Sequence, residues 1–151
     1  MIDEIRDLYQ EVILDHNKHP YHFHAMTDAD ATLEGFNPLC GDHYTFYLKY
    51  DGSTIKEVSF EGSGCAISKA SASIMSSVLE GKTREQADRL FELFVGIITA
   101  KLDPLEHLDE LGKLAAFAGV SEFPMRVKCA TLPWHTMHGA LHGENQHVTT
   151  E

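Results

Sequence analysis

The chain has 151 residues, of which 43% are hydrophobic, enough to build the core of one ordinary domain. Twelve Lys and Arg residues against 23 Asp and Glu residues give a formal net charge of -11. Such a chain repels nucleic-acid phosphates and anionic membrane surfaces, so we expect neither nucleic acid nor membrane as a partner.

The opening residues MIDEIRDLYQEVI lack the basic region and apolar stretch of a signal peptide, and no apolar run is long enough to cross a membrane. A cytoplasmic location is therefore expected. The three cysteines are an odd number, and a reducing cytosol argues against stable disulfides. The thiols are then core side chains, a nucleophile or metal ligands.

Apolar residues spaced by three and four between Ile2 and Ile13 predict a first amphipathic helix, which ends near residues 17–20. Residues 31–36 predict a strand, and apolar residues alternate on both sides of Asp51-Gly52, a pair that favours a tight β-hairpin turn. Ile55 is out of phase with Val58, which indicates either a bulge or a change of face.

Helical spacing resumes after Cys65 and stops at Gly81. Thr83 and Gln86 predict a capping box for the next helix, which we expect to run up to Asp103-Pro104. A short helix is expected around residues 108–114, and a last one over 132–141 with a proline in its first turn. This order predicts an α+β fold, a small antiparallel sheet of about three strands with helices packed on it.

Each cysteine is expected at the end of an element. Cys40 precedes the hairpin, Cys65 marks a strand-to-helix junction, and Cys129 lies at the start of the last helix. None occupies a periodic apolar stripe, which argues against three core thiols. The positive end of a helix dipole would favour the thiolate of Cys65. No C-x-x-C motif is present, so spacing alone leaves metal binding and nucleophilic chemistry both open.

The motifs NPLCGD (37–42), GSGCAIS (62–68) and RVKCATLPWH (126–135) together resemble the U-type proteins of iron-sulfur cluster assembly, and the SufU branch more than the IscU branch. The resemblance runs from Leu8 to Trp134. It implies a single U-type domain over residues 1–151 with a SufE/NifU-like fold. Residues 102–119 are similar to the insertion typical of SufU-type chains.

The resemblance also implies a metal site formed by Cys40, Asp42, Cys65 and Cys129, with Cys40 as the catalytic residue that accepts sulfur. Three thiolates and one carboxylate are a closed tetrahedral set that suits Zn²⁺. No position remains for the water of a hydrolytic zinc enzyme.

The function implied is that of a zinc-dependent sulfurtransferase. Cys40 would take persulfide sulfur from a cysteine desulfurase of the SufS type and pass it to downstream cluster-assembly proteins. The alternative is a scaffold that holds a transient iron-sulfur cluster on the three cysteines and Asp42; a structural zinc domain is a third possibility. Lys128 stands where IscU-type chains carry a histidine, which favours the relay.

Residues beside the motifs are candidates for supporting roles. Arg126 and Lys128 would offset the negative charge of the thiolates, and His43 directly follows Asp42. Ser68 is a candidate donor to a cysteine sulfur, although a position on the helix surface explains it as well. Three histidines at positions 135, 138 and 142 have the spacing of either a second metal site or a solvated helix face.

Overall fold

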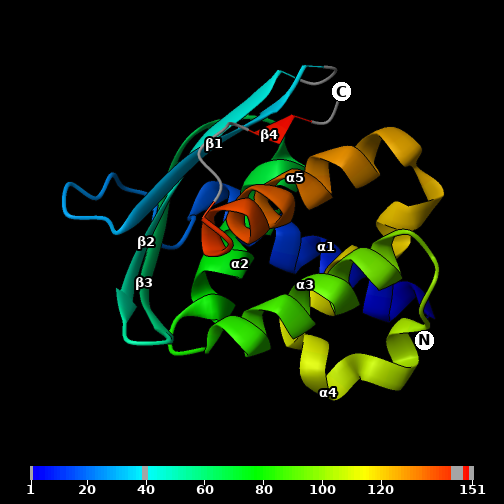
Figure 1. Ribbon diagram of the computed structural model, residues 1–151. Helices are drawn as coiled ribbons and strands as arrows, with labels where there is room; N and C mark the ends of the chain where they lie inside the picture. Colours follow the sequence, from blue (N-terminus) through cyan, green and yellow to red (C-terminus); the bar gives the residue numbers. More distant parts are fainter. Residues whose placement is uncertain (1, 39–40, 144–147, 150–151) are drawn as a thin grey trace.

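The computed structural model describes residues 2–38, 41–143 and 148–149, with side chains between residues 10 and 143. One sheet carries the helices on a single face, which confirms the expected α+β architecture (Figure 1). Among the described residues, no helix is both long and apolar enough to span a membrane.

Three antiparallel strands form the body of the sheet. They are β1 (Ala31–Asn37), β2 (Asp42–Asp51) and β3 (Thr54–Ser63). The predicted three-stranded sheet is therefore confirmed. A two-residue strand near the C terminus, β4 (Val148–Thr149), pairs in parallel with β1 and was not predicted. The strand order is β3-β2-β1-β4.

The phase change along β3 comes from a bulge. The register with β2 shifts between Lys49 and Tyr50, so that Tyr50 pairs with Ile55 while Leu48 pairs with Val58. Ile55 and Val58 are both fully buried. One extra residue in a strand restores the inward direction of the next side chain, which settles the question in favour of a bulge.

The helices follow the expected order with different limits. The capping box is confirmed, because Gln86 N–H donates to Thr83 Oγ1 and Thr83 N–H donates to Gln86 Oε1. The helical segments are α1 (Ile2–Lys18), α2 (Ala66–Leu79), α3 (Arg84–Ile98), η1 (Pro104–His107), α4 (Leu108–Leu111), η2 (Gly112–Glu122) and α5 (Pro124–Leu141).

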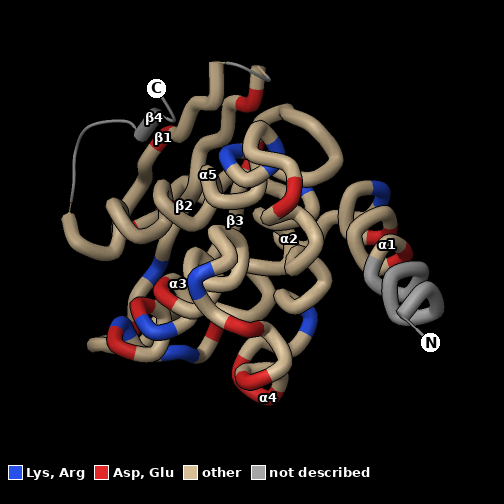
Figure 2. The backbone as a smooth tube through the Cα atoms, turned by 90° about the vertical axis from the view of Figure 1, so that its right-hand side faces the viewer, with Lys and Arg blue, Asp and Glu red and all other residues tan. Residues whose placement is uncertain are grey.

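Helix α3 ends at Ile98, before the predicted limit at Asp103-Pro104. Ala100 adopts a positive φ of 62°, and the N–H groups of Lys101 and Leu102 both donate to the carbonyl of Gly96. These bonds satisfy a carbonyl of the last helical turn and close the helix early. The expected insertion, residues 102–119, starts from this point and contains η1, α4 and part of η2. Figure 2 shows acidic residues on α4.

The last helix begins eight residues earlier than predicted, and this places Cys129 in its second turn instead of at its start. Proline is tolerated in a first turn, and Pro124 occupies that place. Pro133 lies inside the helix, where it has no N–H to donate to the carbonyl of Cys129. Its burial in the core outweighs this local cost, and Ser71 Oγ donates to the next carbonyl, that of Ala130, at 2.6 Å.

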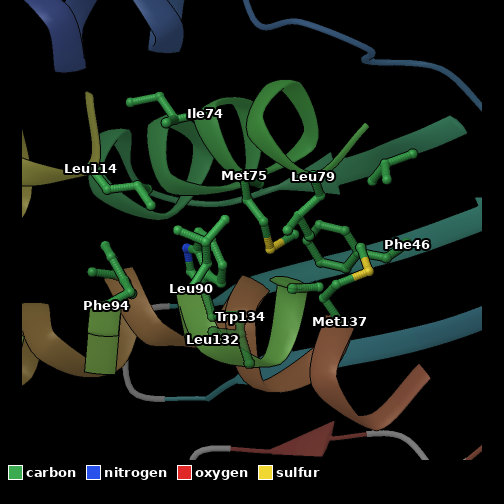
Figure 3. Close-up of a cluster of buried hydrophobic side chains, with 14 of the residues drawn as sticks. Phe46, Ile74, Met75, Leu79, Leu90, Phe94, Leu114, Leu132, Trp134 and Met137 are labelled. Carbon is green, nitrogen blue, oxygen red and sulfur yellow. The ribbon is translucent and has the colours of Figure 1, made fainter. Parts of the chain in front are cut away.

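Trp134 is the largest fully buried side chain, with 1% of its surface exposed. Its ring stacks on Phe94 of α3 with centroids 5.0 Å apart, and Figure 3 shows both among the core side chains of α2, α3 and α5. The tryptophan therefore fixes α5 against α3. At the sheet, α5 lies so close to β1 that a Cβ added at Gly35 would come within 2.1 Å of Thr136 Oγ1.

We expect Trp134→Ala to lower the free energy of unfolding by about 3–5 kcal/mol, because a large buried ring is replaced by a cavity. Urea denaturation of the metal-free protein measures the loss. Leu105→Ala is the control, since Leu105 is 74% exposed and its truncation should change stability by no more than about 0.5 kcal/mol. Equal losses in the two variants would contradict the assignment of Trp134 to the core.

Candidate metal centre

Three strand ends meet at one edge of the sheet. Asn37 at the end of β1 pairs with Asp42 at the start of β2, and Ser63 at the end of β3 pairs with His43. Helix α2 begins just beyond β3, at Ala66. Antiparallel pairing thus brings the first two cysteine motifs together. Cys40 belongs to the connection between β1 and β2, and it lies outside the described residues.

Three of the predicted ligands converge at this edge. A carboxylate oxygen of Asp42 and the Sγ atoms of Cys65 and Cys129 all lie within 4.8 Å of one another. Asp42 is 1% exposed and Cys129 is 2% exposed, whereas Cys65 is only partly buried. Residues far apart in the sequence therefore form one compact group of metal-binding atoms, reachable from the side of Cys65.

Asp42 is held by hydrogen bonds from three sides. Its Oδ1 accepts from the N–H of Cys65 at 2.8 Å and from Ser68 Oγ at 3.0 Å, and its Oδ2 accepts from Asn37 Nδ2 at 3.0 Å. A buried carboxylate requires such donors to offset the loss of hydration. Oδ2 accepts one of these three bonds and Oδ1 two, so Oδ2 keeps more capacity to bind a metal ion.

Cys65 is the N-cap of α2, and its sulfur accepts from the N–H of Ser68 at 3.5 Å. A hydrogen bond with Cys129 is the main reason why the pKa of Cys65 falls from 9.0 to about 6, and the contacts with Ser68 add to it, while burial acts in the opposite direction. The metal-free site therefore holds one thiolate at neutral pH, the form that binds metals.

The hydroxyl groups of Ser68 and Tyr44 form a hydrogen-bonded chain that ends at the carboxylate of Asp42. Ser68 donates its one proton to Asp42, so Tyr44 Oη, 2.9 Å from Ser68 Oγ, is the donor of the next bond. Burial raises the pKa of Tyr44, which keeps the phenol protonated. The Ser68 hydroxyl therefore donates to Asp42 and not to a sulfur as the sequence suggested; toward Cys65 Sγ the donor is the backbone N–H of Ser68.

Sequence reasoning missed Asn37 and Tyr44. Both are fully buried, and Asn37 Nδ2 also contacts Cys129 Sγ at 3.3 Å, so that it links a strand residue to the third cysteine. The sequence shows Asn37 only as the first residue of the NPLCGD motif and Tyr44 only as one of the alternating residues before Asp51-Gly52. The available signal was a polar side chain at the start of a cysteine motif, and its partner 92 residues away was not deducible.

Gly64 closes the group on the side of β3. A Cβ at this position would lie 2.4 Å from Asp42 Oδ1, 2.5 Å from Tyr44 Oη and 2.6 Å from Ser68 Oγ. A larger residue would displace the atoms that fix the carboxylate. The glycine of the GSGC motif is thus required by the close approach of the backbone to the site.

The proposed neighbours of the site lie on exposed positions. His43 stacks on Phe36 and faces Glu34 at 3.8 Å, and Arg126 lies over the ring of Phe123. Lys128 is exposed while the adjacent Cys129 is buried, because neighbouring residues of a helix face different directions. The contacts described for His43 and Arg126 are therefore made outside the group of ligand atoms.

The family model described as the NifU-like N terminal domain matches residues 8–130, which include all three cysteines. The chain belongs to the NifU-like N-terminal domain family. The match covers both sides of the expected insertion at residues 102–119, and the fold of this NifU-like domain agrees with the α+β prediction.

Two relatives bear names that state different functions. The domain is 35% identical to the iron-sulfur cluster assembly scaffold protein IscU of Streptococcus pyogenes serotype M1, over 99% of this chain and 94% of that one. It is 39% identical to the zinc-dependent sulfurtransferase SufU of Bacillus subtilis, over 86% of each chain.

A solved structure shares the fold. It is a candidate iron-sulfur cluster assembly scaffold protein for the SUF system from Fervidobacterium islandicum AW-1. The two are 38% identical, with a TM-score of 0.81 over 87% of this chain and 94% of that one. The NifU-like domain therefore has relatives in both functional groups that the sequence analysis considered.

We expect the metal-free protein to react with iodoacetamide at Cys65 with a pH midpoint near 6, since the thiolate is the reactive form and its pKa is lowered to about 6. The reaction rises as the pH passes upward through the pKa. Peptide mass spectrometry separates Cys65 from the other cysteines. In Cys129→Ala the midpoint should move upward, because the main hydrogen bond to the thiolate is lost; an unchanged midpoint would contradict the assigned cause.

Asn37→Ala should weaken binding of Zn²⁺ about 10–100-fold, because the residue orients Asp42 and Cys129 together. Competition with a chromophoric chelator measures the affinity, and far-ultraviolet circular dichroism shows whether the variant is folded. Asn17→Ala, at the end of α1, is the matched control and should bind Zn²⁺ like the parent chain. Equal affinities for all three proteins would show that Asn37 does not position the ligands.

Proposed function

We propose that this NifU-like domain is a zinc-dependent sulfur carrier of iron-sulfur cluster assembly. Cys40 would accept persulfide sulfur from a cytoplasmic cysteine desulfurase of the SufS type and relay it to downstream cluster-assembly proteins. The observation that carries the proposal is the buried group formed by Asp42, Cys65 and Cys129. The relative from Bacillus subtilis, a zinc-dependent sulfurtransferase, supports it.

The donor atoms fit zinc. Two sulfurs and one carboxylate oxygen lie close enough to share an ion, and Cys40, in the connection next to Asp42, would supply the third sulfur. Zinc accepts such mixed sulfur and oxygen sets in tetrahedral geometry. When bound, the ion would hold the cysteines as thiolates at neutral pH. The residues proposed to hold it are Cys40, Asp42, Cys65 and Cys129.

The transfer itself is an exchange between two sulfur-sulfur bonds. The Cys40 thiolate attacks the outer sulfur of the persulfide on the desulfurase, and a new sulfur-sulfur bond forms on Cys40. The bond between the two sulfurs of the donor breaks, and the desulfurase cysteine leaves as a thiolate. Electrons balance within this exchange, so neither an oxidant nor a reductant is consumed.

The positions of the three cysteines along the chain support different roles for them. Cys65 is the N-cap of α2, where its backbone N–H donates to Asp42, and Cys129 lies within α5, which Trp134 packs into the core, so both residues have fixed positions. Cys40 belongs to a short connection between strands that are anchored on both sides by Asn37 and Asp42. A carrier needs one thiol that meets a partner and a rigid remainder, which supports Cys40 as the acceptor.

The second candidate is a scaffold on which an iron-sulfur cluster is assembled as cargo. The observation that favours it is Asp42 Oδ2, an oxygen ligand among sulfurs, because iron-sulfur clusters prefer thiolates and an oxygen ligand would be released more easily. The relative from Streptococcus pyogenes, an iron-sulfur cluster assembly scaffold protein, agrees with this alternative.

Turnover of a SufS-type cysteine desulfurase should rise saturably as the zinc-loaded protein is added under anaerobic conditions, and mass spectrometry should find added sulfur on Cys40. Cys40→Ala should abolish the stimulation, because it removes the attacking thiolate. Cys40→Ala is compared with the parent protein at equal measured zinc content, so that a loss of sulfur transfer is not confused with a loss of metal. Sulfur on Cys65 or Cys129 instead, or no stimulation by the parent protein, would refute the relay.

The scaffold alternative has its own readout. Anaerobic incubation with iron and sulfide, followed by an apo-ferredoxin, should show no cluster transfer if the relay is the function. If the protein is a scaffold, the cluster forms and moves, and Asp42→Ala slows its release because the labile oxygen ligand is lost. If the protein neither accepts sulfur nor transfers a cluster, the remaining interpretation is a structural zinc domain.

A further inference from the structure

A second group of metal-binding side chains lies at the other end of α5. Asp88 of α3 faces two histidines of α5, with its Oδ1 atom 3.4 Å from His138 Nδ1 and 3.0 Å from His142 Nε2. The three ligand atoms lie within 4.8 Å of one another.

The histidines are held in place by packing. The His138 ring stacks on Phe91 of α3, with centroids 4.3 Å apart and planes within 8°. His138 Nδ1 is buried and has no hydrogen-bond partner among the described residues, although it points at the carboxylate. His142 is the C-cap of α5, one helical turn after His138. Buried polar atoms are normally hydrogen-bonded, so the missing partner of His138 Nδ1 calls for an explanation.

The spacing also fits a shared metal ion, which would replace the hydrogen bond that joins His142 Nε2 and Asp88 Oδ1 at 3.0 Å. Tetrahedral coordination with bonds of about 2.1 Å places ligand atoms about 3.4 Å apart, close to the observed contacts around Asp88 Oδ1. The two imidazole rings have centroids 4.4 Å apart, and a nitrogen of each faces the same carboxylate oxygen, so one cation can reach all three groups.

The sequence considered three histidines here, and the structure sorts them. His135 packs its ring edge-on against Phe91 and is absent from the group, whereas Asp88, 50 residues before His138, replaces it as the third ligand. Two imidazoles and one carboxylate are the ligands of zinc, cobalt and nickel ions, and they differ from the sulfur ligands of the first site.

We propose that Asp88, His138 and His142 form a second site for a divalent transition-metal ion of the zinc class, with solvent as the remaining ligand. The ion would join the end of α5 to α3. Because α5 carries Cys129 near its beginning, the helix would then be tied at both ends. The site is partly exposed and contains no thiolate, so it should bind and release metal more readily than the first.

Cobalt(II) is the probe that separates the two sites. Full-length protein first receives one equivalent of Zn²⁺ and is then titrated with Co²⁺. We expect one equivalent of Co²⁺ to bind with visible d-d absorption and no sulfur-to-cobalt charge-transfer band, and paramagnetic broadening of the His138 and His142 ring signals in nuclear magnetic resonance spectra. The Co²⁺-dependent rise in melting temperature measures the link between the helices.

His142→Ala and Asp88→Asn should each weaken this Co²⁺ binding at least about tenfold, since each removes a ligand. His135→Ala is the matched control on the same helix and should bind Co²⁺ like the parent. No binding beyond the first equivalent, or an equal loss in His135→Ala, would overturn the proposal. A charge-transfer band would place the cobalt at the cysteines. If zinc leaves the cysteine site empty, cobalt that binds there gives this band without changing the responses of His142→Ala and Asp88→Asn, so the two proposals fail separately.

Discussion

The structure depends on a carboxylate that is buried where three strands end. Asp42 loses its hydration there, and hydrogen bonds from Asn37, Ser68 and the backbone of Cys65 replace it. These donors belong to β1, α2 and the turn before α2, so the same bonds that make the carboxylate tolerable also tie the sheet edge to the helix. Two of the three ligand atoms, those of Asp42 and Cys65, are fixed by this arrangement.

The third ligand is positioned by the core. Cys129 lies in α5, and Trp134 stacked on Phe94 sets the position of that helix. The helix keeps a proline in its interior because burial of the surrounding side chains outweighs one lost hydrogen bond. The close approach of Gly35 to Thr136 brings α5 against β1, which is why Asn37 at the end of that strand can reach the sulfur of Cys129.

The two groups of metal-binding atoms differ in the chemistry that each can support. The first joins sulfur to a buried carboxylate, and the hydrogen bond from Cys129 favours the thiolate of Cys65, the form that binds metal ions. The second has imidazole nitrogens near the surface and no sulfur. One helix carries candidate ligands of both, so an ion bound at either end would act on the same element.

The sequence by itself determined what depends on neighbours along the chain: the Asp51-Gly52 hairpin, the Thr83 capping box and the three cysteine motifs. Through its resemblance to U-type proteins it also predicted Cys40, Asp42, Cys65 and Cys129 as ligands, of which the last three are described and lie together. The tertiary structure alone decided the start of α5, the contact of Asn37 with Cys129 and the pairing of Asp88 with His138. These depend on packing between segments 50 or more residues apart, where the free energy of a buried contact overrides the local preference of a proline or a turn residue.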